Sequence, residues 1–308
     1  MSAGSDRAES IRQRLRNVLR RRGEDAQFGL QRYAAERFLY RLGESSHREK
    51  LVLKGAALFS LWGAAVYRAT RDLDFTGLGS PDADRLLSML SDVCQVPSPG
   101  DGLTFDSQTL SAEPIRDDSE YSGLRVRLEA RLGESRILVQ IDIGFGNAIV
   151  PAPSQVSYPT LLGDPTPRIL AYPLEAVIAE KLHAMVVLGE RNSRFKDFYD
   201  LYVLAGQFEF DGGNLTAAIT ATFARRRTTA GGPLPASLRP AFFAEAARGV
   251  QWRAYLTRNG LPGAPGSFED LGEVLIAFIG APWAEGITFD RVWPAGGPWM
   301  SREKEAVG

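Results

Sequence analysis

Five prolines between residues 151 and 167 constrain the fold more than any other feature of the sequence. Proline has a fixed φ and no backbone N–H, so this stretch can be neither a continuous helix nor a central strand. Before it, apolar and polar residues alternate, and after it the apolar residues recur at helical spacing. We therefore predict a linker or wrapped connection, with a first domain at residues 1–160 and a helical second domain at residues 161–308.

The residues before the prolines predict a sheet with flanking helices. Leu124–Arg131 and Ile137–Ile143 both alternate, and the turn residues between them predict an antiparallel hairpin. Short strands are expected at Leu51–Leu53 and Arg71–Phe75. Helical spacing is found at Ser10–Arg22, Gln31–Leu42, Ala56–Trp62 and Asp84–Val93.

The residues after the prolines have a helical pattern. Their apolar positions repeat with the helical period at Leu174–Leu188, Arg194–Leu204, Leu215–Arg226, Pro240–Arg258 and Phe268–Ile279. Glycine-rich segments separate the last three of these helices. The fold class expected for the whole chain is therefore α+β, with a mixed or antiparallel sheet flanked by helices and a helical C-terminal domain.

Composition excludes several classes of protein. A formal net charge of −1 gives no global attraction to nucleic acid, so RNA contact would need local clusters such as Arg20–Arg22 and Arg225–Arg227, although such clusters are more often solvated faces. One cysteine excludes an internal disulfide, and two histidines exclude a three-histidine metal site. No signal peptide is recognisable and no apolar run approaches the length needed to cross a bilayer, so we expect a cytoplasmic protein without a membrane partner.

Two aspartates, Asp72 and Asp74, lie in one of the strand-like segments. A period of two points both carboxylates to one side and the apolar residues between them to the other. Magnesium takes a few carboxylates and otherwise binds water and substrate phosphate, so this spacing suits one or two nucleotide-bound cations. A solvated strand end whose acids pair with Arg68 or Arg71 would explain the same pattern.

Asp142 is the one acid on the polar side of the second hairpin strand, among branched apolar residues. Such an acid needs a partner. One candidate partner is a metal shared with Asp72 and Asp74, which would make Asp142 a third ligand from a neighbouring strand. The other is an arginine across the hairpin, at Arg125, Arg127 or Arg131.

Lys181 emerges from the apolar stripe of a predicted helix, where a charge needs a partner or water. It could bind a triphosphate, or it could pair with Asp197 or Asp200, which are three apart on the next helix and share a face. One of these acids would position substrate or orient Lys181. The other would pair with a neighbouring arginine, Arg191 or Arg194.

With these residues in place, the chain resembles the nucleotidyltransferase toxins of the AbiEii family, including its mycobacterial members. The resemblance runs from about Leu51 to Leu204, with a weaker echo near Trp293–Trp299. The matching pieces stand in the family's order, at Leu53-Lys54-Gly55, Arg68–Phe75, Val139–Ile143, Ala179–Ala184 and Arg194–Tyr202.

The resemblance implies a polymerase-beta-like nucleotidyltransferase core, magnesium, a nucleoside triphosphate (NTP) substrate and a cognate antitoxin protein. Some relatives act on the acceptor ends of tRNA and so stop translation, which extends the expectation to an RNA acceptor, the tRNA 3′ end. The expected metal ligands are Asp72, Asp74 and Asp142. The expected catalytic residues are Asp72, Asp74, Lys181 and Asp197, with the second domain contributing Lys181, Asp197 and Asp200 to the cleft. The expected substrate-binding residues are Lys54, Gly55, Thr70, Asp200 and Arg194.

Two positions of the resemblance carry particular consequences. Gly55 joins a strand to a helix start, where backbone N–H groups can approach phosphate, but Ala56 stands where the family often has a second glycine and where broader nucleotidyltransferases have a serine nearby. The pose of the nucleotide is therefore left open. Thr70, two positions before the first acid, is in family terms a target of modification by a kinase-like antitoxin.

Two other functions fit the same residues. The first is transfer of a nucleotide to a protein or small-molecule hydroxyl. The second is a catalytically silent module that binds nucleotide or a partner protein.

Overall fold

The computed structural model describes residues 3–62, 72–115, 123–261 and 263–302, which form two compact units. The first holds the described residues up to position 147 together with residues 154–172, and the second holds residues 148–153 and those from 173 onward. Thr70, the expected modification site, lies outside the described residues, as do Arg68 and Arg71. The boundary predicted between residues 160 and 161 stays a prediction.

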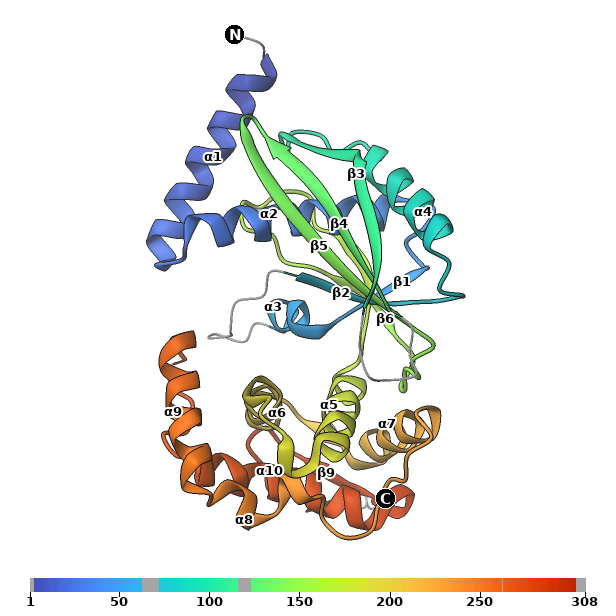
Figure 1. Ribbon diagram of the computed structural model, residues 1–308, viewed down its shortest axis with the longest axis vertical. Helices are drawn as coiled ribbons and strands as arrows, with labels where there is room; N and C mark the ends of the chain where they lie inside the picture. Colours follow the sequence, from blue (N-terminus) through green and yellow to red (C-terminus); the bar gives the residue numbers. More distant parts are fainter. Residues whose placement is uncertain (1–2, 63–71, 116–122, 262, 303–308) are drawn as a thin grey trace, which may run out of the picture. The chain divides into compact units, whose positions relative to one another are not determined.

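The first unit is built on a seven-stranded sheet in the order β3-β4-β5-β2-β1-β7-β6 (Figure 1). The pairs β2–β5 and β1–β7 are parallel and the other neighbours antiparallel, so the sheet is mixed. Its strands are β1 (Leu51–Lys54), β2 (Asp72–Gly77), β3 (Leu103–Ile115), β4 (Gly123–Leu132), β5 (Ser135–Phe145), β6 (Ser154–Ser157) and β7 (Arg168–Ala171).

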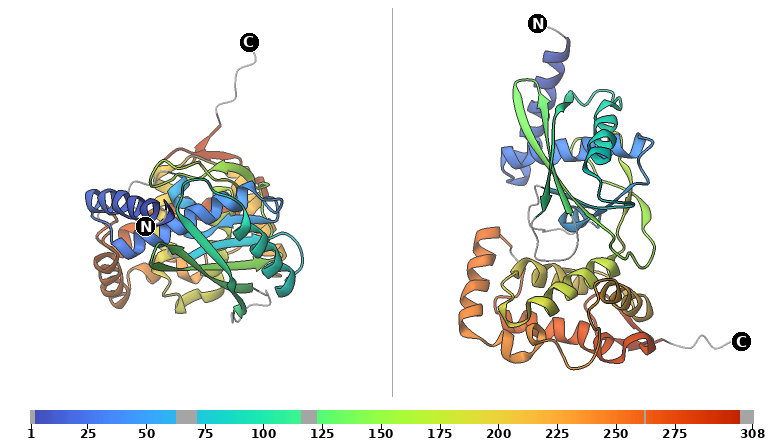
Figure 2. Two further views of the ribbon diagram at one scale, coloured as in Figure 1. Left: turned by 90° about the horizontal axis from the view of Figure 1, so that it is seen from above. Right: turned by 45° about the vertical axis from the view of Figure 1, so that its right-hand side comes forward.

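The predicted hairpin is confirmed as the antiparallel pair β4–β5, which Figure 2 shows in green from two directions. Along both strands apolar residues are buried on one face and polar residues are partly exposed on the other. The helical elements of this unit are α1 (Ala3–Arg22), α2 (Ala26–Glu44), the 3-10 turn η1 (Gly55–Ala57), α3 (Leu58–Leu61) and α4 (Ala83–Gln95). The single helix expected at 56–62 is thus a 3-10 turn followed by one short helical turn.

Helix α2 covers the apolar face of the sheet. Phe38 of α2 meets Phe105 of β3 at 5.9 Å between ring centroids, and Phe105 lies opposite Ala130, on the face that buries Val126 and Leu128. The polar residues of the same strands therefore point to the other face of the sheet. That face carries the acids predicted from the sequence.

The proline-rich segment contains one strand that the sequence did not predict, β6, and a second one, β7, follows it directly. β6 lies between Pro153 and Pro159 and pairs with β7, which in turn pairs in parallel with β1. β6 is the last strand of the sheet, and an edge strand is where neighbouring prolines are tolerated because one side of its backbone needs no partner. The prolines thus exclude a central strand, as expected, but permit an edge.

The second unit is mainly helical. Its elements are α5 (Leu174–Leu188), η2 (Gly189–Arg191), α6 (Phe195–Gln207), β8 (Phe210–Asp211), α7 (Gly212–Arg225), η3 (Ala236–Leu238), α8 (Pro240–Phe243), α9 (Ala246–Asn259), α10 (Phe268–Glu285), η4 (Gly286–Thr288), β9 (Arg291–Trp293) and β10 (Met300–Ser301). The three short strands form a small sheet of their own. The mixed sheet flanked by helices and this helical part confirm the predicted α+β fold class.

The single helix predicted at Pro240–Arg258 is wrong, because the chain breaks into α8 and α9 at Glu245, whose backbone is extended. Phe242 in α8 and Trp252 in α9 both pack against Phe268, with ring centroids 6.2 and 5.6 Å away. In one continuous helix these two side chains would point about 80° apart, at roughly 100° per residue. The break lets both reach the same aromatic cluster.

The expectation that no apolar run could cross a bilayer also needs correction. Residues 268–288, which include α10, pass the test of length and composition for a membrane span. The core helix of a globular unit passes the same test, and α10 buries Leu271, Leu275 and Phe278 within the helical unit.

Candidate active site

Ionisable side chains form a row across five neighbouring strands on the polar face of the sheet. In register order the row reads Glu113, Arg125, Asp142, Asp74 and Lys54, one residue from each of β3, β4, β5, β2 and β1. Register partners in adjacent strands lie side by side on the same face, about 4.8 Å apart along the hydrogen-bonding direction. A second row beside it runs from Arg127 through Gln140 to Asp72.

The row brings together the three aspartates that the sequence predicts as metal ligands. Asp72 and Asp74 are partly exposed, whereas Leu73 between them is buried, so both acids point to the polar face. Asp142 is the register partner of Asp74 in the parallel pair β2–β5. Hence the third acid lies on the strand next to the first two and on the same face.

Gly55 lies directly against Asp74. It has a φ of +69°, and a Cβ built on it would come within 2.2 Å of Asp74 Oδ2. Any side chain at position 55 would therefore displace the carboxylate, in addition to the strain of the left-handed backbone. The turn between β1 and η1 thus leaves room for the carboxylate of Asp74. A carboxylate oxygen is the type of ligand that a hard divalent cation takes.

The third aspartate is held by an arginine. Arg125 Nε lies 2.9 Å from Asp142 Oδ1 and Arg125 Nη2 lies 2.7 Å from Oδ2, a bidentate ion pair between β4 and β5. Among the described residues, no three acidic, histidine or cysteine side chains are arranged as a complete metal site. Asp142 thus has the arginine partner that the sequence had left as an alternative. Asp72 and Asp74 supply carboxylate oxygens, the ligand type that magnesium takes.

Lys54 brings a positive charge to the same face. A Cβ placed on Gly144 of β5 would lie 3.7 Å from Lys54 Nζ, so the lysine reaches from β1 across β2 toward β5. Its Nζ also lies 5.8 Å from the centroid of the Tyr172 ring. A lysine beside a row of carboxylates can bind phosphate oxygens that a cation has brought there.

A hydrogen-bonded trio that the sequence did not predict adjoins Lys54. The hydroxyls of Thr76 and Tyr172 are 2.6 Å apart, and Asn147 Nδ2 donates to them at 3.1 and 3.3 Å. Thr76 could have been found, because it continues the alternation of Asp72 and Asp74. Tyr172 and Asn147 could not, because they arrive from distant segments with no local signal.

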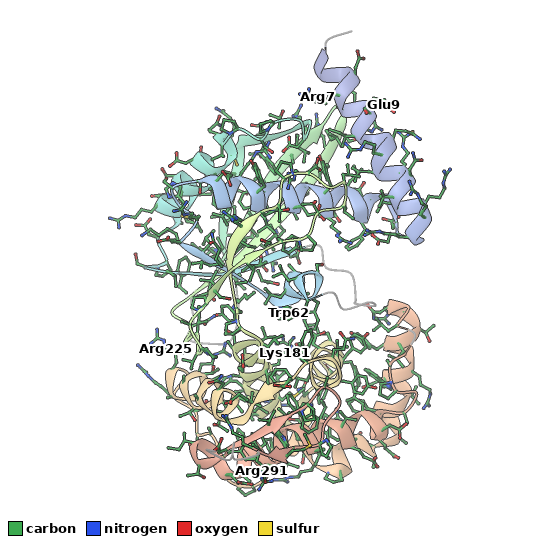
Figure 3. The ribbon with its side chains drawn as sticks, turned by 180° about the vertical axis from the view of Figure 1, so that it is seen from behind. Arg7, Glu9, Trp62, Lys181, Arg225 and Arg291 are labelled. Atoms are coloured by element: carbon green, nitrogen blue, oxygen red, sulfur yellow. The ribbon has the colours of Figure 1, made fainter. Side chains whose placement is uncertain are left out.

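The second group of predicted residues lies in the helical unit. Lys181 of α5, labelled in Figure 3, lies 2.9 Å from Asp197 Oδ1 and 2.6 Å from Asp200 Oδ2, both on α6. Arg194 Nε lies 2.7 Å from Asp197 Oδ2. From the sequence we expected one of the two acids to orient Lys181 and the other to pair with an arginine. In the structure Asp197 does both, because it contacts Lys181 and Arg194.

Burial and charge together set the protonation of this cluster. Burial alone would lower the pKa of Lys181, but Asp197 and Asp200 outweigh it and raise the pKa above its ordinary value. Burial alone would raise the pKa of Asp197, but Lys181 and Arg194 outweigh it and lower that pKa. Lys181 is therefore a fully charged ammonium whose position is set by two carboxylates.

His183, expected to have a structural role, lies on the same helix as Lys181 and contacts other residues. Its Nδ1 lies 3.0 Å from Arg226 Nη1, and burial, reinforced by Arg226, lowers its pKa to about 4. Within the cluster Arg225–Arg227, Arg226 is thus part of the helical packing, whereas Arg225 and Arg227 are exposed.

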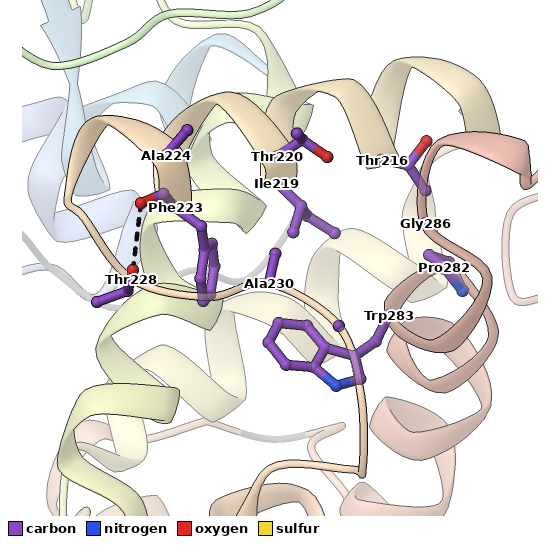
Figure 4. Close-up of a pocket in the computed structure, with 11 residues that line it drawn as sticks. Thr216, Ile219, Thr220, Phe223, Ala224, Thr228, Ala230, Pro282, Trp283 and Gly286 are labelled. Carbon is purple, nitrogen blue, oxygen red and sulfur yellow. Dashed lines mark hydrogen bonds between the residues drawn. The ribbon is translucent and has the colours of Figure 1, made fainter.

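A pocket of about 240 Å³ between α7 and α10 contains none of the described residues predicted for the site (Figure 4). Phe223, Ile219 and Trp283 form much of its wall. Two of its threonine hydroxyls donate to backbone carbonyls, Thr216 to Gly213 and Thr228 to Phe223. The pocket is therefore mainly an apolar surface, and no charged side chain lines it.

Comparison with known proteins identifies the class of this chain. The sequence profile of a family described as nucleotidyl transferase AbiEii toxin, type IV toxin-antitoxin system, matches residues 37–290, well over half of the chain. The match places the chain among nucleotidyltransferases. Within that class, it belongs to the AbiEii toxin family of type IV toxin–antitoxin systems, which confirms the resemblance found in the sequence.

Two crystal structures from Helicobacter pylori are similar to the chain, JHP933 and a candidate nucleotidyltransferase. Each is 14% identical to the chain and has a TM-score of 0.45. Each alignment covers 82% of the residues of this chain. The alignments cover 89% of JHP933 and 92% of the second protein. Among curated proteins, none matches the chain.

Proposed function

We propose that this toxin-family nucleotidyltransferase moves a nucleoside monophosphate from an NTP onto an RNA, with the tRNA 3′ end as acceptor, and thereby inhibits translation. The observation that carries the proposal is the placement of Asp72, Asp74 and Asp142 on one face of adjacent strands, with Lys54 beside them. Membership of the AbiEii family supports the nucleotidyl-transfer chemistry.

The proposed roles follow from the chemistry of each side chain. Asp72, Asp74 and Asp142 would hold one or two magnesium ions, which when bound polarise the phosphoryl group and balance charge on the leaving pyrophosphate. Lys54 binds phosphate oxygens. Gly55 joins β1 to the start of η1, where backbone N–H groups can bind the triphosphate.

The charge cluster of the helical unit supplies the second part of the proposed site. Lys181 contacts the triphosphate as a cation, and Asp197 keeps its ammonium oriented. Arg194, whose side chain is half-exposed, binds substrate directly, and the buried Asp200 acts on the substrate through Lys181, which it contacts. Support comes from the short contacts around Lys181, which hold a charged amine in one place. The proposal requires that the second domain, residues 161–308, present this cluster to the nucleotide.

Three further expectations belong to the same proposal. The protein acts in the cytoplasm without a membrane, a cognate antitoxin neutralises it, and Thr70 is a position that such an antitoxin could modify. Contacts from the exposed Arg225 and Arg227 to the RNA backbone would make RNA binding weaken as salt rises.

The decisive experiment incubates the purified protein with each labelled NTP, magnesium and total RNA. Label should appear on tRNA with the native chain and be lost with Asp74→Asn. Asp84→Asn, an exposed aspartate in the first turn of α4, serves as the matched control and should retain full transfer. Label on protein or small acceptors instead would redirect the proposal to hydroxyl adenylylation. Nucleotide binding without transfer would reduce the chain to a binding module.

A further inference from the structure

The ion pair between Arg125 and Asp142 lies where a metal site would need its third carboxylate. Two donors of the guanidinium take one lone-pair direction on each oxygen of Asp142. A cation bound between Asp74 and Asp142 would bring a second positive charge to the same carboxylate. Arg125 and a cation therefore compete for Asp142.

The row of charges also provides a place for Arg125 once it is displaced. Glu113 of β3 is the register partner of Arg125 on the side away from Asp142, and its carboxylate is half-exposed. Glu113 already accepts Arg127 Nη2 at 2.7 Å, so its carboxylate is oriented toward β4. A guanidinium that leaves Asp142 would thus keep an acidic neighbour one strand away, and Arg125 itself is about one-third exposed and able to turn.

We propose that Arg125 is a displaceable counter-ion of Asp142 that sets the affinity of the site for divalent cations. Asp142 exchanges Arg125 for a cation held by Asp72 and Asp74, and the guanidinium turns toward Glu113. The inference rests on the proposed function in one respect, the binding of a divalent cation at Asp72 and Asp74. It makes Arg125 a positioning residue that acts through Asp142.

The test is a calorimetric titration of the full-length protein with Mn²⁺, which requires no catalysis. Removing the competitor in Arg125→Ala should lower the Mn²⁺ dissociation constant about three- to tenfold, the range expected for a partly exposed bidentate pair. Arg125→Lys keeps the charge but loses the two-pronged contact, and should bind Mn²⁺ with intermediate affinity. This conservative variant keeps the test possible if Arg125→Ala does not fold.

Arg131→Ala is the matched control for loss of one positive charge. Arg131 lies on the same strand and face, but pairs with Glu129 and contacts neither Asp142 nor Glu113, so the Mn²⁺ dissociation constant should change less than about twofold. In an Asp142→Asn background, Arg125→Ala should no longer tighten binding, because the carboxylate for which the two cations compete is gone.

The outcomes separate this inference from the function on which it rests. Equal effects of Arg125→Ala and Arg131→Ala, or weaker binding in Arg125→Ala, would overturn the inference. Unchanged binding in Asp142→Asn would also overturn it, while the proposed site would stand provided that Asp74→Asn abolishes Mn²⁺ binding. If Asp74→Asn binds Mn²⁺ like the native chain, the metal site of the proposed function fails as well.

Discussion

At the scale of single residues, the closest constraint on the candidate site is the contact between Gly55 and Asp74. The carboxylate occupies the space where any side chain at position 55 would lie. The glycine is therefore needed for two independent reasons, its left-handed backbone and the space it leaves. These reasons can be separated by experiment, because Gly163 shares only the first.

Gly55→Ala should reduce nucleotidyl transfer by about a hundredfold, since a displacement of about 1 Å at a reacting centre can cost that much. Gly163→Ala is the control, because Gly163 has nearly the same φ, +72°, but nothing within 4 Å of its Cβ position. Both variants should lose roughly 1–2 kcal/mol of stability to backbone strain. Equal activity in the two variants would show that the contact with Asp74 does not matter.

Lys181 presents a different residue-scale problem, because its two acidic partners are buried almost completely. An isolated carboxylate in such a place is costly, and removing one member of a buried pair costs more than the pair contributes. The same contacts that would orient Lys181 for phosphate therefore also support the helical unit. Activity measurements alone cannot distinguish these roles, but stability as a function of pH can.

Lys181→Met should lower the free energy of unfolding at pH 7 by about 3–5 kcal/mol. In the native chain the pKa of Asp197 is lowered, so its contribution is present above its unfolded pKa and is lost as the pH falls through its folded pKa. Without Lys181, the burial of Asp197 is opposed only by Arg194 and Lys196, so its pKa should rise from the native value. The difference in free energy of unfolding between the native chain and Lys181→Met, measured by urea unfolding, should therefore become smaller as the pH falls from 7 to 4.5.

Arg194→Met is the control for this prediction. Its guanidinium is half-exposed, so solvent screens its pair with Asp197 and the loss should stay below about 1 kcal/mol. If the difference in free energy of unfolding between Lys181→Met and the native chain does not change with pH, then the charge of Asp197 does not cause that difference. That result would assign the effect of Lys181 to packing of its methylene groups.

At the scale of elements, α1 and α2 hold the proline-rich connection through contacts to its backbone. Arg14 and Arg37 donate to the carbonyls of Leu162 and Pro165, and Glu36 accepts from the N–H of Leu161 at 2.8 Å. Burial raises the pKa of Glu36 to about 7, and the hydrogen bond from Leu161 only partly offsets it. The attachment of this segment is therefore sensitive to pH near neutrality.

Because of Glu36, the free energy of unfolding of the native chain should rise as the pH falls from 8 to 5. A carboxyl whose folded pKa is raised contributes stability below its unfolded pKa, and this is lost as the pH rises through about 7. Glu36→Gln should abolish this component and be more stable than the native chain by about 1–2 kcal/mol at pH 8. Glu134→Gln, on the exposed hairpin turn, should behave like the native chain in urea unfolding across this range.

The elements differ in how far the sequence predicts them. The hairpin of β4 and β5 and helix α5 follow from long periodic patterns, because one buried face repeats over many residues. β6 and β7 have only four residues each and no such repeat, so their pairing depends on tertiary contacts. For the same reason the sequence could place Asp142 on a polar face but could not choose between Arg125 and a metal, since alternation does not specify which residues lie opposite each other.

At the scale of the whole molecule, the described residues form two units with separate cores. The alternating patterns of the first and the helical patterns of the second predict this division. The exact boundary is harder to predict, because the proline-rich segment includes β6 and is followed directly by β7, both of which belong to the first unit. Residues 161–172 are the critical stretch, because they follow the predicted boundary and contain β7.

Fragments ending on either side of this stretch should therefore behave differently. A fragment of residues 1–172 keeps β7, which pairs with Val52 and Leu53 of β1, and Tyr172, whose N–H donates to Leu53 O at 2.9 Å. A fragment of residues 1–160 leaves β1 as an unpaired edge and β6 without its partner, which favours aggregation.

We expect fragment 1–172 to unfold cooperatively by circular dichroism and fragment 1–160 to show no cooperative transition. A fragment of residues 173–308 should be soluble and helical, because Phe198, Phe268 and Phe278 lie in a core formed within its own unit. The contrary result is equally specific. If fragment 1–160 melts at the same temperature as fragment 1–172, then β7 does not stabilise the sheet. The first domain would then end at residue 160, as the prolines predict.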